Sequence, residues 1–234
     1  MVLKTICFDA DDTLWHNERF FRLTEARFVQ LLADYATTED LANHLVAAER
    51  RNLERYGYGI KGFVLSMIET ALQVTDNQVP GAVIAELIAV GKDMLGHPIE
   101  LLPGAEAAIE ELATDYRLLL ITKGDLLNQE QKLARSGLGD KFDGVEIVSE
   151  KTTEVYRGIF TGRGLVPDTV MMVGNSLKSD INPVLHAGAW AVHVPFEMTW
   201  ALEDAPTPVG HPRFREIATL AELPSLVSGI ARNI

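Results

Sequence analysis

Short apolar runs that alternate with helical segments constrain the fold of this chain more than any other feature. The near-continuous apolar runs cover residues 2–8, 117–122, 144–149, 169–174 and 189–194. Strands that are buried on both faces have this composition, whereas strands with one solvated face alternate between apolar and polar residues. Helical patterns over 105–114, 126–135, 178–187 and 221–232 separate or follow these runs. We therefore expect an α/β fold with a doubly wound parallel sheet.

The stretch from residue 16 to 97 interrupts this alternation and carries only helical patterns. Apolar residues recur at three- and four-residue intervals in segments at about 23–35, 38–55, 63–74 and 81–95. Thr-Thr-Glu-Asp at the start of the second segment is typical of a helix N-terminus. We predict a Rossmann-like core formed by 1–15 and 98–234, an inserted all-helical domain at 16–97, and a surface loop at 206–212.

Composition and charge limit the kinds of partner. The 234 residues carry a net charge of -12, which argues against nucleic acid or an anionic membrane as a partner, although a small phosphorylated metabolite needs only a locally positive pocket. Cys7 is the only cysteine, so no intramolecular disulfide forms, and its apolar surroundings favour a buried thiol. No apolar run reaches the ~18 residues of a membrane span, and the N-terminus lacks a signal-peptide pattern. We expect a cytoplasmic monomer or homodimer.

Three acids follow the first apolar run directly, at Asp9, Asp11 and Asp12. Crowded like charges destabilise a fold unless a cation or a proton offsets them. In an extended segment Asp9 and Asp11 project to the same side, which favours a Mg²⁺ site or a nucleophile with a neighbouring acid/base. The alternative is structural, because Asp12 or Thr13 is also suited to starting the next helix.

Polar residues also follow the later runs. Ligands of open α/β sheets bind beyond the carboxyl ends of the strands, where this chain has Thr122–Asp125, Ser149–Lys151 and Gly174–Asp180. These groups suit phosphoryl transfer, with Thr122 and nearby backbone N–H groups on phosphate, Lys151 balancing charge and Asp180 helping to hold the metal. Taken singly, each has an ordinary structural explanation, and Ser176 and Ser179 are better explained as helix caps.

With these residues in order, the chain resembles the haloacid dehalogenase-like hydrolase superfamily. The family's DxDxT motif appears as Asp9-Ala10-Asp11-Asp12-Thr13, and its strand ending in Thr or Ser as Leu118–Thr122. Its lysine is best placed at Lys151, and its acidic segment as Val173–Asp180. The resemblance covers 1–15 and about 98–234, and the insertion at 16–97 looks like the family's C1-type helical cap.

The resemblance implies a Mg²⁺-dependent phosphatase that hydrolyses a small phosphomonoester through an aspartyl-phosphate. Asp9 is then the nucleophile and Asp11 the acid/base, and Mg²⁺ binds Asp9, the backbone carbonyl of Asp11, and Asp180. The phosphate-binding candidates are Thr13, Thr122, Lys123, Gly124, Lys151 and Asn175. Dehalogenating and phosphonate-cleaving members lack the second acid, so Asp11 favours the phosphatase branch. Phosphonate-cleaving members carry a cap lysine, for which Lys61 is a candidate, although a solvated lysine is the simpler explanation.

Two departures from the family pattern keep alternatives open. Asn175 stands where the family usually has Asp, which implies weaker metal binding or a role through hydrogen bonds alone. Lys123 stands where Asn is usual, and it either adds charge toward phosphate, the reading we favour, or points to solvent. The alternatives are a catalytically weak phospho-ligand-binding or regulatory protein on the same fold, and a 2-haloacid dehalogenase. A receiver domain fits poorly, because receivers do not carry the acceptor aspartate on the first strand.

The helical insertion is expected to select the substrate by closing over the site. The candidates for substrate contact are Trp15, His16, Tyr56, Tyr58 and Lys61, and packing inside the insertion is an equal alternative for the two tyrosines. Nucleotides, sugar phosphates and 2-phosphoglycolate all remain possible substrates at this point.

Overall fold

A computed structural model describes residues 3–198 and 200–232, and these residues form two compact units. The core unit comprises 3–18, 99–123 and the described residues from 129 onward. The helical unit comprises 19–98 together with 124–128. The predicted division at 15/16 and 97/98 is close to these limits, but 124–128 were not expected in the helical unit. That the helical unit serves as a cap stays a prediction.

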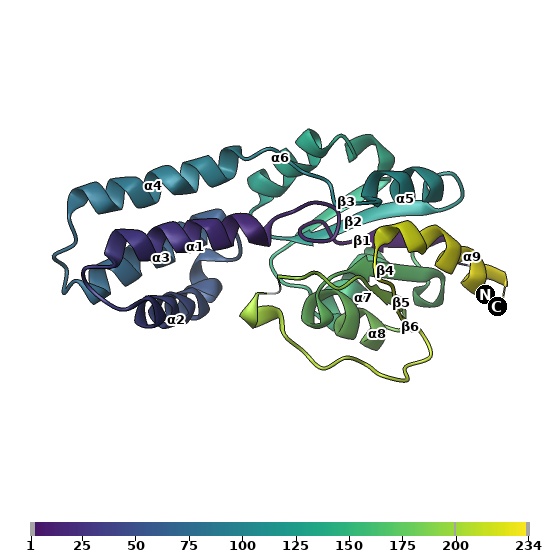
Figure 1. Ribbon diagram of the computed structural model, residues 1–234. Coiled ribbons are helices and arrows are strands. Elements are labelled where there is room, and N and C mark those ends of the chain that lie inside the picture. Colours follow the sequence, from purple (N-terminus) through teal and green to yellow (C-terminus); the bar gives the residue numbers. More distant parts are fainter. Residues whose placement is uncertain (1–2, 199, 233–234) are drawn as a thin grey trace. The chain divides into compact units, whose positions relative to one another are not determined.

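The core unit contains a parallel six-stranded sheet with the order β3-β2-β1-β4-β5-β6 (Figure 1). Its strands are β1 Thr5–Phe8, β2 Arg117–Lys123, β3 Gly144–Val148, β4 Val170–Gly174, β5 Trp190–His193 and β6 Phe214–Glu216. The predicted doubly wound parallel sheet is confirmed. β1 lies between β2 and β4, where the strand order reverses, so the end of β1 is the point at which such sheets bind ligands. Val2, the start of the first predicted run, lies outside the described residues.

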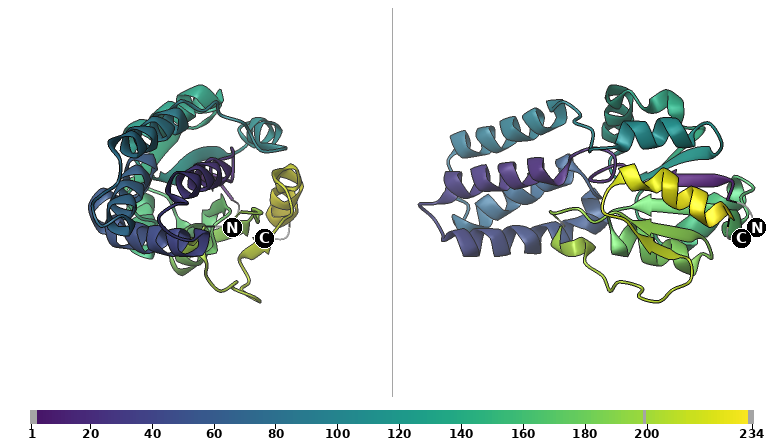
Figure 2. Two further views of the ribbon diagram at one scale, coloured as in Figure 1. Left: turned by 60° about the vertical axis from the view of Figure 1, so that its left-hand side comes forward. Right: turned by 45° about the vertical axis from the view of Figure 1, so that its right-hand side comes forward.

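Helices cover both faces of the sheet, as Figure 2 shows. Helices α5 Ala105–Leu112 and α9 Leu223–Arg232 bury apolar side chains with Ile6 and Phe8 on one face. Helices α7 Thr153–Gly162 and α8 Asn182–His186 do so with Cys7 on the other face. Alternate residues of β1 thus serve opposite faces, as the two-residue period of a strand requires. Cys7 is buried as predicted, and burial raises the pKa of its thiol to about 12.

Several elements differ from the sequence prediction. Helix α7 was missed, although Val155, Tyr156, Ile159 and Phe160 have helical spacing and the Thr152 side chain caps it by accepting from the Val155 N–H. The helix predicted at 178–187 is instead a π-helical turn, Leu177–Ile181, followed by α8. Strand β6 was missed because three residues at the edge of a sheet carry no apolar run. Residues 206–212 lie in no helix or strand, as expected for a loop.

The helical unit contains four helices that run side by side in Figures 1 and 2. They are α1 Glu18–Leu32, whose first residue belongs to the core unit, α2 Thr38–Tyr56, α3 Ile60–Val74 and α4 Gly81–Gly96. Phe28, Leu45, Phe63, Met67 and Leu87 are among the side chains buried between them. The predicted cap at the start of α2 is present, since Thr37 Oγ1 accepts from the Asp40 N–H. None of the described helices is long and apolar enough to cross a membrane.

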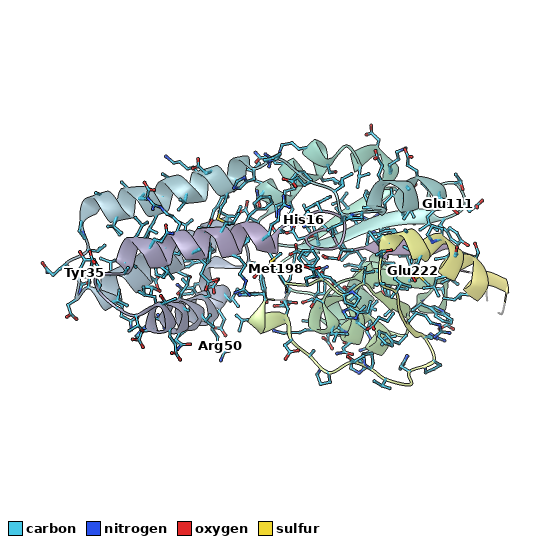
Figure 3. The ribbon with its side chains drawn as sticks, in the orientation of Figure 1. His16, Tyr35, Arg50, Glu111, Met198 and Glu222 are labelled. Carbon is cyan, nitrogen blue, oxygen red and sulfur yellow. The ribbon has the colours of Figure 1, made fainter. Side chains whose placement is uncertain are left out.

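The two segments that connect the core unit to the insertion pair with each other inside the core unit. Trp15 and Leu101 form an antiparallel bridge. The His16 N–H donates to the Glu100 carbonyl at 3.0 Å, and the Leu102 N–H donates to the Leu14 carbonyl at 2.8 Å. Figure 3 labels His16, which lies in the first of these two segments. The outgoing and returning segments are therefore held together by backbone hydrogen bonds.

Candidate active site

The chain turns sharply just beyond β1. The Leu14 N–H donates to the Ala10 carbonyl at 2.8 Å, the Asp12 N–H donates to the Trp15 carbonyl at 2.7 Å, and Asp12 has a left-handed φ of 59°. The expectation that Asp9 and Asp11 project from one extended segment is therefore wrong, because the strand ends at Phe8. Asp12 has the structural role considered as an alternative. Its carboxylate accepts from the backbone N–H groups of Asn17 and Glu18 where α1 begins.

Asp9, Lys151 and Asp180 form a buried cluster at the carboxyl edge of the sheet. Lys151 Nζ lies 2.5 Å from Asp9 Oδ1 and 2.7 Å from Asp180 Oδ1. The other Asp9 oxygen accepts from Thr13 Oγ1 at 3.0 Å, and the other Asp180 oxygen accepts from the Ser176 N–H at 3.0 Å. Asp9, Lys151 and Asp180 follow three different strands, and their side chains meet at the edge of the sheet, as the order of the motifs predicted.

Electrostatics in this cluster are dominated by burial. Burial raises the pKa of Asp9 to about 7, the charge of Lys151 opposes this shift and that of Asp180 adds to it. For Lys151, burial acts to lower the pKa, but the Asp180 and Asp9 carboxylates outweigh it and raise the pKa above its usual value. The lysine is thus held as a cation. Two carboxyl groups face this one ammonium group, and the raised pKa of Asp9 shows that a second negative charge in this buried cluster is costly. A further cation would favour ionisation of Asp9.

The donor atoms of the cluster fit Mg²⁺, which binds oxygen ligands. Asp9 and Asp180 each direct a carboxylate oxygen at the same ammonium, so both already face a common cation. The Asp11 side chain does not join them, and among the described residues no three His, Cys, Asp or Glu side chains gather as a metal cluster. Of the predicted metal set, Asp9 and Asp180 thus have their carboxylates in this cluster and Asp11 does not, and binding of Mg²⁺ by these residues stays a prediction.

Gly174, at the end of β4, makes room for the Asp180 carboxylate. A Cβ at position 174 would lie 2.3 Å from Asp180 Oδ2 and 2.4 Å from its Cγ. The carboxylate is held by Lys151 and by the Ser176 N–H, so moving it away from a Cβ at position 174 would break these hydrogen bonds. The absence of a side chain at 174 is therefore a requirement of this site.

Gly174→Ala should destabilise the protein by about 3 kcal/mol, because overpacking at a fixed neighbour forces the backbone to shift. Urea unfolding of the metal-free protein measures the change. The matched control is Gly158→Ala in the middle of α7, where a Cβ meets nothing within 4 Å. It should be neutral or stabilising by about 0.5–1 kcal/mol. Equal effects of the two substitutions would contradict the steric argument.

Asp11 has a set of partners separate from that of Asp9. Its Oδ1 accepts from Trp15 Nε1 at 2.7 Å, and its Oδ2 accepts from Gln129 Nε2 at 3.1 Å. Lys132 Nζ lies 2.9 Å from both oxygens. Trp15 was predicted to contact substrate, but it is 1% exposed and instead orients Asp11. Gln129 and Lys132 were not predicted, because polar residues on one face of a helix are usually solvated.

Three predicted phosphate-binding residues are hydrogen-bonded to these two sets of partners, Thr13 and Asn175 on the side of Asp9 and Thr122 on the side of Asp11. Thr13 Oγ1 lies 3.2 Å from Asn175 Oδ1 and accepts from the Asn175 N–H at 3.1 Å. The Asn175 carbonyl accepts from His193 Nε2 at 3.0 Å. Thr122 is buried and its Oγ1 accepts from Gln129 Nε2 at 2.8 Å, which links the end of β2 to the partners of Asp11. Asn175 thus connects to the nucleophile candidate through a threonine hydroxyl.

Lys123 does not point to solvent, one of the two orientations expected for it, and its contact with phosphate stays a prediction. Its side chain is 14% exposed and forms a close ion pair with Glu203. Lys123 Nζ also donates to Ser179 Oγ at 2.8 Å, while Glu203 accepts from the hydroxyls of Ser176 and Ser179 at 2.5 Å each. Burial opposes ionisation of Glu203, but Lys123 and the hydroxyl groups hold its pKa below the usual value. Glu203 lies outside every motif and therefore escaped the sequence analysis.

The remaining predicted residues lie in the helical unit or at its connection. Gly124 has a φ of 144°, which glycine readily adopts, and the next residue, Asp125, pairs with Lys61 at 2.9 Å. Lys61 is thus ion-paired, although its side chain is 55% exposed. Tyr56 Oη donates to Glu69 at 3.1 Å, and the His16 ring lies 5.8 Å from that of Phe196. Substrate contacts by Tyr56, Tyr58, Lys61 and His16 stay predictions.

The fold and the cluster together define an α/β protein with a parallel sheet and an aspartate cluster at the topological switch point of that sheet. A family model described as haloacid dehalogenase-like hydrolase matches residues 3–188, and the chain belongs to this family. The predicted resemblance is thereby confirmed.

Known relatives place the chain within this family. A crystal structure of a haloacid dehalogenase-like family hydrolase from Xanthomonas campestris is 38% identical, covers 99% of this chain and 93% of its own, and has a TM-score of 0.89. Glyceraldehyde 3-phosphate phosphatase from Methanothermobacter thermautotrophicus is 28% identical in an alignment that covers 87% of this chain and 90% of that protein. Human N-acylneuraminate-9-phosphatase is 25% identical in an alignment that covers 97% of this chain and 95% of that protein.

Proposed function

We propose that this protein is a Mg²⁺-dependent phosphatase that hydrolyses a small phosphorylated metabolite through an aspartyl-phosphate intermediate. The observation that carries the proposal is the buried contact of Lys151 Nζ with both Asp9 and Asp180 at the switch point of the sheet. The curated relatives at 28% and 25% identity are phosphatases, which supports the same reaction class.

In the first step a carboxylate oxygen of Asp9 attacks phosphorus and the bond from phosphorus to the leaving oxygen breaks. Asp11 donates a proton to that oxygen, so the product leaves as a neutral alcohol. Lys151, Thr122 and backbone N–H groups near Gly124 are the proposed contacts of the phosphoryl oxygens, with Thr13 and Asn175 supporting Asp9. Lys151 offsets the negative charge of the transferring group.

In the second step water attacks phosphorus and Asp11 takes the proton that this water loses. The bond between Asp9 and phosphorus breaks, which releases inorganic phosphate and restores the Asp9 carboxylate. The carboxylates of Asp9 and Asp180 and the backbone carbonyl of Asp11 are the proposed ligands of Mg²⁺. When bound, the ion offsets the repulsion between carboxylate and phosphate and polarises a phosphoryl oxygen.

Two features favour a second function, a catalytically weak protein that binds a phosphorylated ligand. The charge of Lys123 is already offset by Glu203, and Asn175 supplies an amide where a carboxylate is usual in the family. Both features reduce the charge available to metal and phosphate. A 2-haloacid dehalogenase is disfavoured, because that chemistry requires no acid at Asp11 for the leaving group.

A panel of phosphorylated metabolites and p-nitrophenyl phosphate tests the proposal. We expect release of inorganic phosphate that requires Mg²⁺, stops with EDTA and returns when Mg²⁺ is restored. Isothermal titration with the same compounds separates the two candidates, since a binder gives tight complexes with negligible turnover. Release of halide from 2-haloacids in place of phosphate would reject both.

A further inference from the structure

Lys132 is the buried cation that the proposed reaction leaves unexplained. It lies on α6, Leu126–Ser136, and is only 9% exposed. Lysines are rarely this buried unless they are paired, because moving an ammonium group out of water is costly. The chain keeps the charge in place although a neutral side chain of similar length would avoid this cost. The partners of the ammonium group therefore indicate what it does.

All three hydrogens of the Lys132 ammonium have acceptors. Two are the carboxylate oxygens of Asp11, each at 2.9 Å, and the third is Asn17 Oδ1 at 2.8 Å. Gln129, one helical turn earlier on α6, donates from Nε2 to Asp11 Oδ2 at 3.1 Å. Residues three apart lie on the same face of a helix, so α6 presents both donors to one carboxylate.

Trp15 is a further donor to the Asp11 carboxylate. Its Nε1 donates to Asp11 Oδ1 at 2.7 Å and its ring is fully buried. Asp11 itself lies in a turn beyond β1, where the strand no longer fixes its direction. Its side chain is therefore oriented by donors on α6 and by Trp15, and the strongest of these interactions is the charge-assisted one with Lys132.

We propose that Lys132 is a positioning residue that fixes the orientation of the Asp11 carboxylate for proton transfer to and from the substrate oxygen. This inference rests on the proposed phosphatase function, since it concerns the step in which Asp11 protonates the leaving group. The hydrogen-bond partners of Lys132 are Asp11 and Asn17, and not Asp9. Gln129 supports the same orientation and ties it to Thr122 at the end of β2.

The inference predicts a dependence on the leaving group that a purely structural role does not give. A weakly basic leaving group such as p-nitrophenolate departs with little help from an acid, whereas a more basic phenolate needs the proton. The ratio kcat/KM covers the steps through phosphoryl transfer to Asp9, so hydrolysis of the intermediate does not affect it. A series of p-nitrophenyl, phenyl and p-methoxyphenyl phosphates keeps the shape of the substrate nearly constant.

For Lys132→Met we expect kcat/KM to fall by about 100-fold with phenyl phosphate and by only about threefold with p-nitrophenyl phosphate. Lys132→Arg should recover most of the loss, because it restores donors to the carboxylate. The matched control is Lys141→Met, a lysine of the core unit whose ion pair with Glu110 is exposed. It should leave all three rates unchanged. Equal losses on all substrates, or no loss, would overturn the inference.

A second measurement does not depend on turnover. The indole N–H resonance of Trp15, assigned with Trp15→Phe, reports on the hydrogen bond to Asp11. It should shift in Lys132→Met, return toward the wild-type position in Lys132→Arg and stay in place in Lys141→Met. An unmoved resonance in Lys132→Met overturns the inference even in an active enzyme. If the wild type hydrolyses neither the aryl phosphates nor any compound of the metabolite panel, the proposed function fails, and the resonance alone decides whether Lys132 holds Asp11.

Discussion

Asp9→Asn should lower phosphatase activity by at least about 10⁴-fold, because an amide oxygen does not replace the attacking carboxylate. The substitution should not weaken the fold. Burial raises the pKa of Asp9 from 3.8 to about 7, so the native structure disfavours the ionised form relative to the unfolded chain. The side chain of Asn has the same size, and Lys151 keeps its contact with Asp180.

The sign of the pH dependence follows from this raised pKa. The unfolded chain releases the Asp9 proton near pH 4 and the metal-free native protein does so only near pH 7, so ionisation destabilises the fold progressively between these values. Asp9→Asn should therefore raise the melting temperature in EDTA at pH 8 and have little effect at pH 4. Asp168→Asn, which removes a half-exposed partner of Arg213, serves as the control with unchanged activity. Turnover by Asp9→Asn at the wild-type rate would exclude Asp9 as the nucleophile.

Lys151→Met should destabilise the metal-free protein by about 3–5 kcal/mol, the usual cost of removing one partner from a buried ion pair. The Asp9 and Asp180 carboxylates would then be buried together without a cation. These carboxylates raise the pKa of Lys151, so its ammonium group is charged at neutral pH. Removing it should therefore destabilise the protein at neutral pH. Urea unfolding at pH 8 in EDTA measures the change.

Two conditions should relieve this destabilisation. Saturating Mg²⁺ should restore part of the lost stability, because it supplies positive charge to the same two carboxylates. A lower pH should also help, since protonation removes the repulsion between Asp9 and Asp180. Lys141→Met again provides a control with little effect, since exposed ion pairs contribute at most about 1 kcal/mol. A loss of stability that neither Mg²⁺ nor pH changes would indicate that Lys151 acts by packing alone.

The sequence was sufficient to predict the sheet and the convergence of Asp9, Lys151 and Asp180. Parallel strands place their carboxyl ends at one edge, so residues that follow successive strands meet there whatever the intervening loops do. The direction of Asp11 could not be predicted in this way. The two-residue period holds only within a strand, and β1 ends at Phe8, before the turn that carries Asp11.

The partners of Asp11 and Lys123 depend on tertiary packing that no local pattern records. Lys132 reaches Asp11 across 121 positions of sequence, and Glu203 reaches Lys123 across 80. Neither Lys132 nor Glu203 belongs to a motif, and a charged residue on a helix or loop is by default solvated. Sequence patterns therefore predicted the proposed reacting groups, while the residues paired with them emerged only from the folded structure.

The backbone pairing of residues 14–16 with 100–102 has a consequence for the evolution of this architecture. Backbone hydrogen bonds in this pairing already join the two ends of the inserted segment. The sheet is therefore connected to a closed loop, whatever the length of that segment. The entropy of loop closure grows only slowly with the number of residues, so exchanging one insertion for another disturbs the sheet little. A lineage with such a connection is free to exchange the inserted helices while the sheet and the residues at its strand ends stay the same.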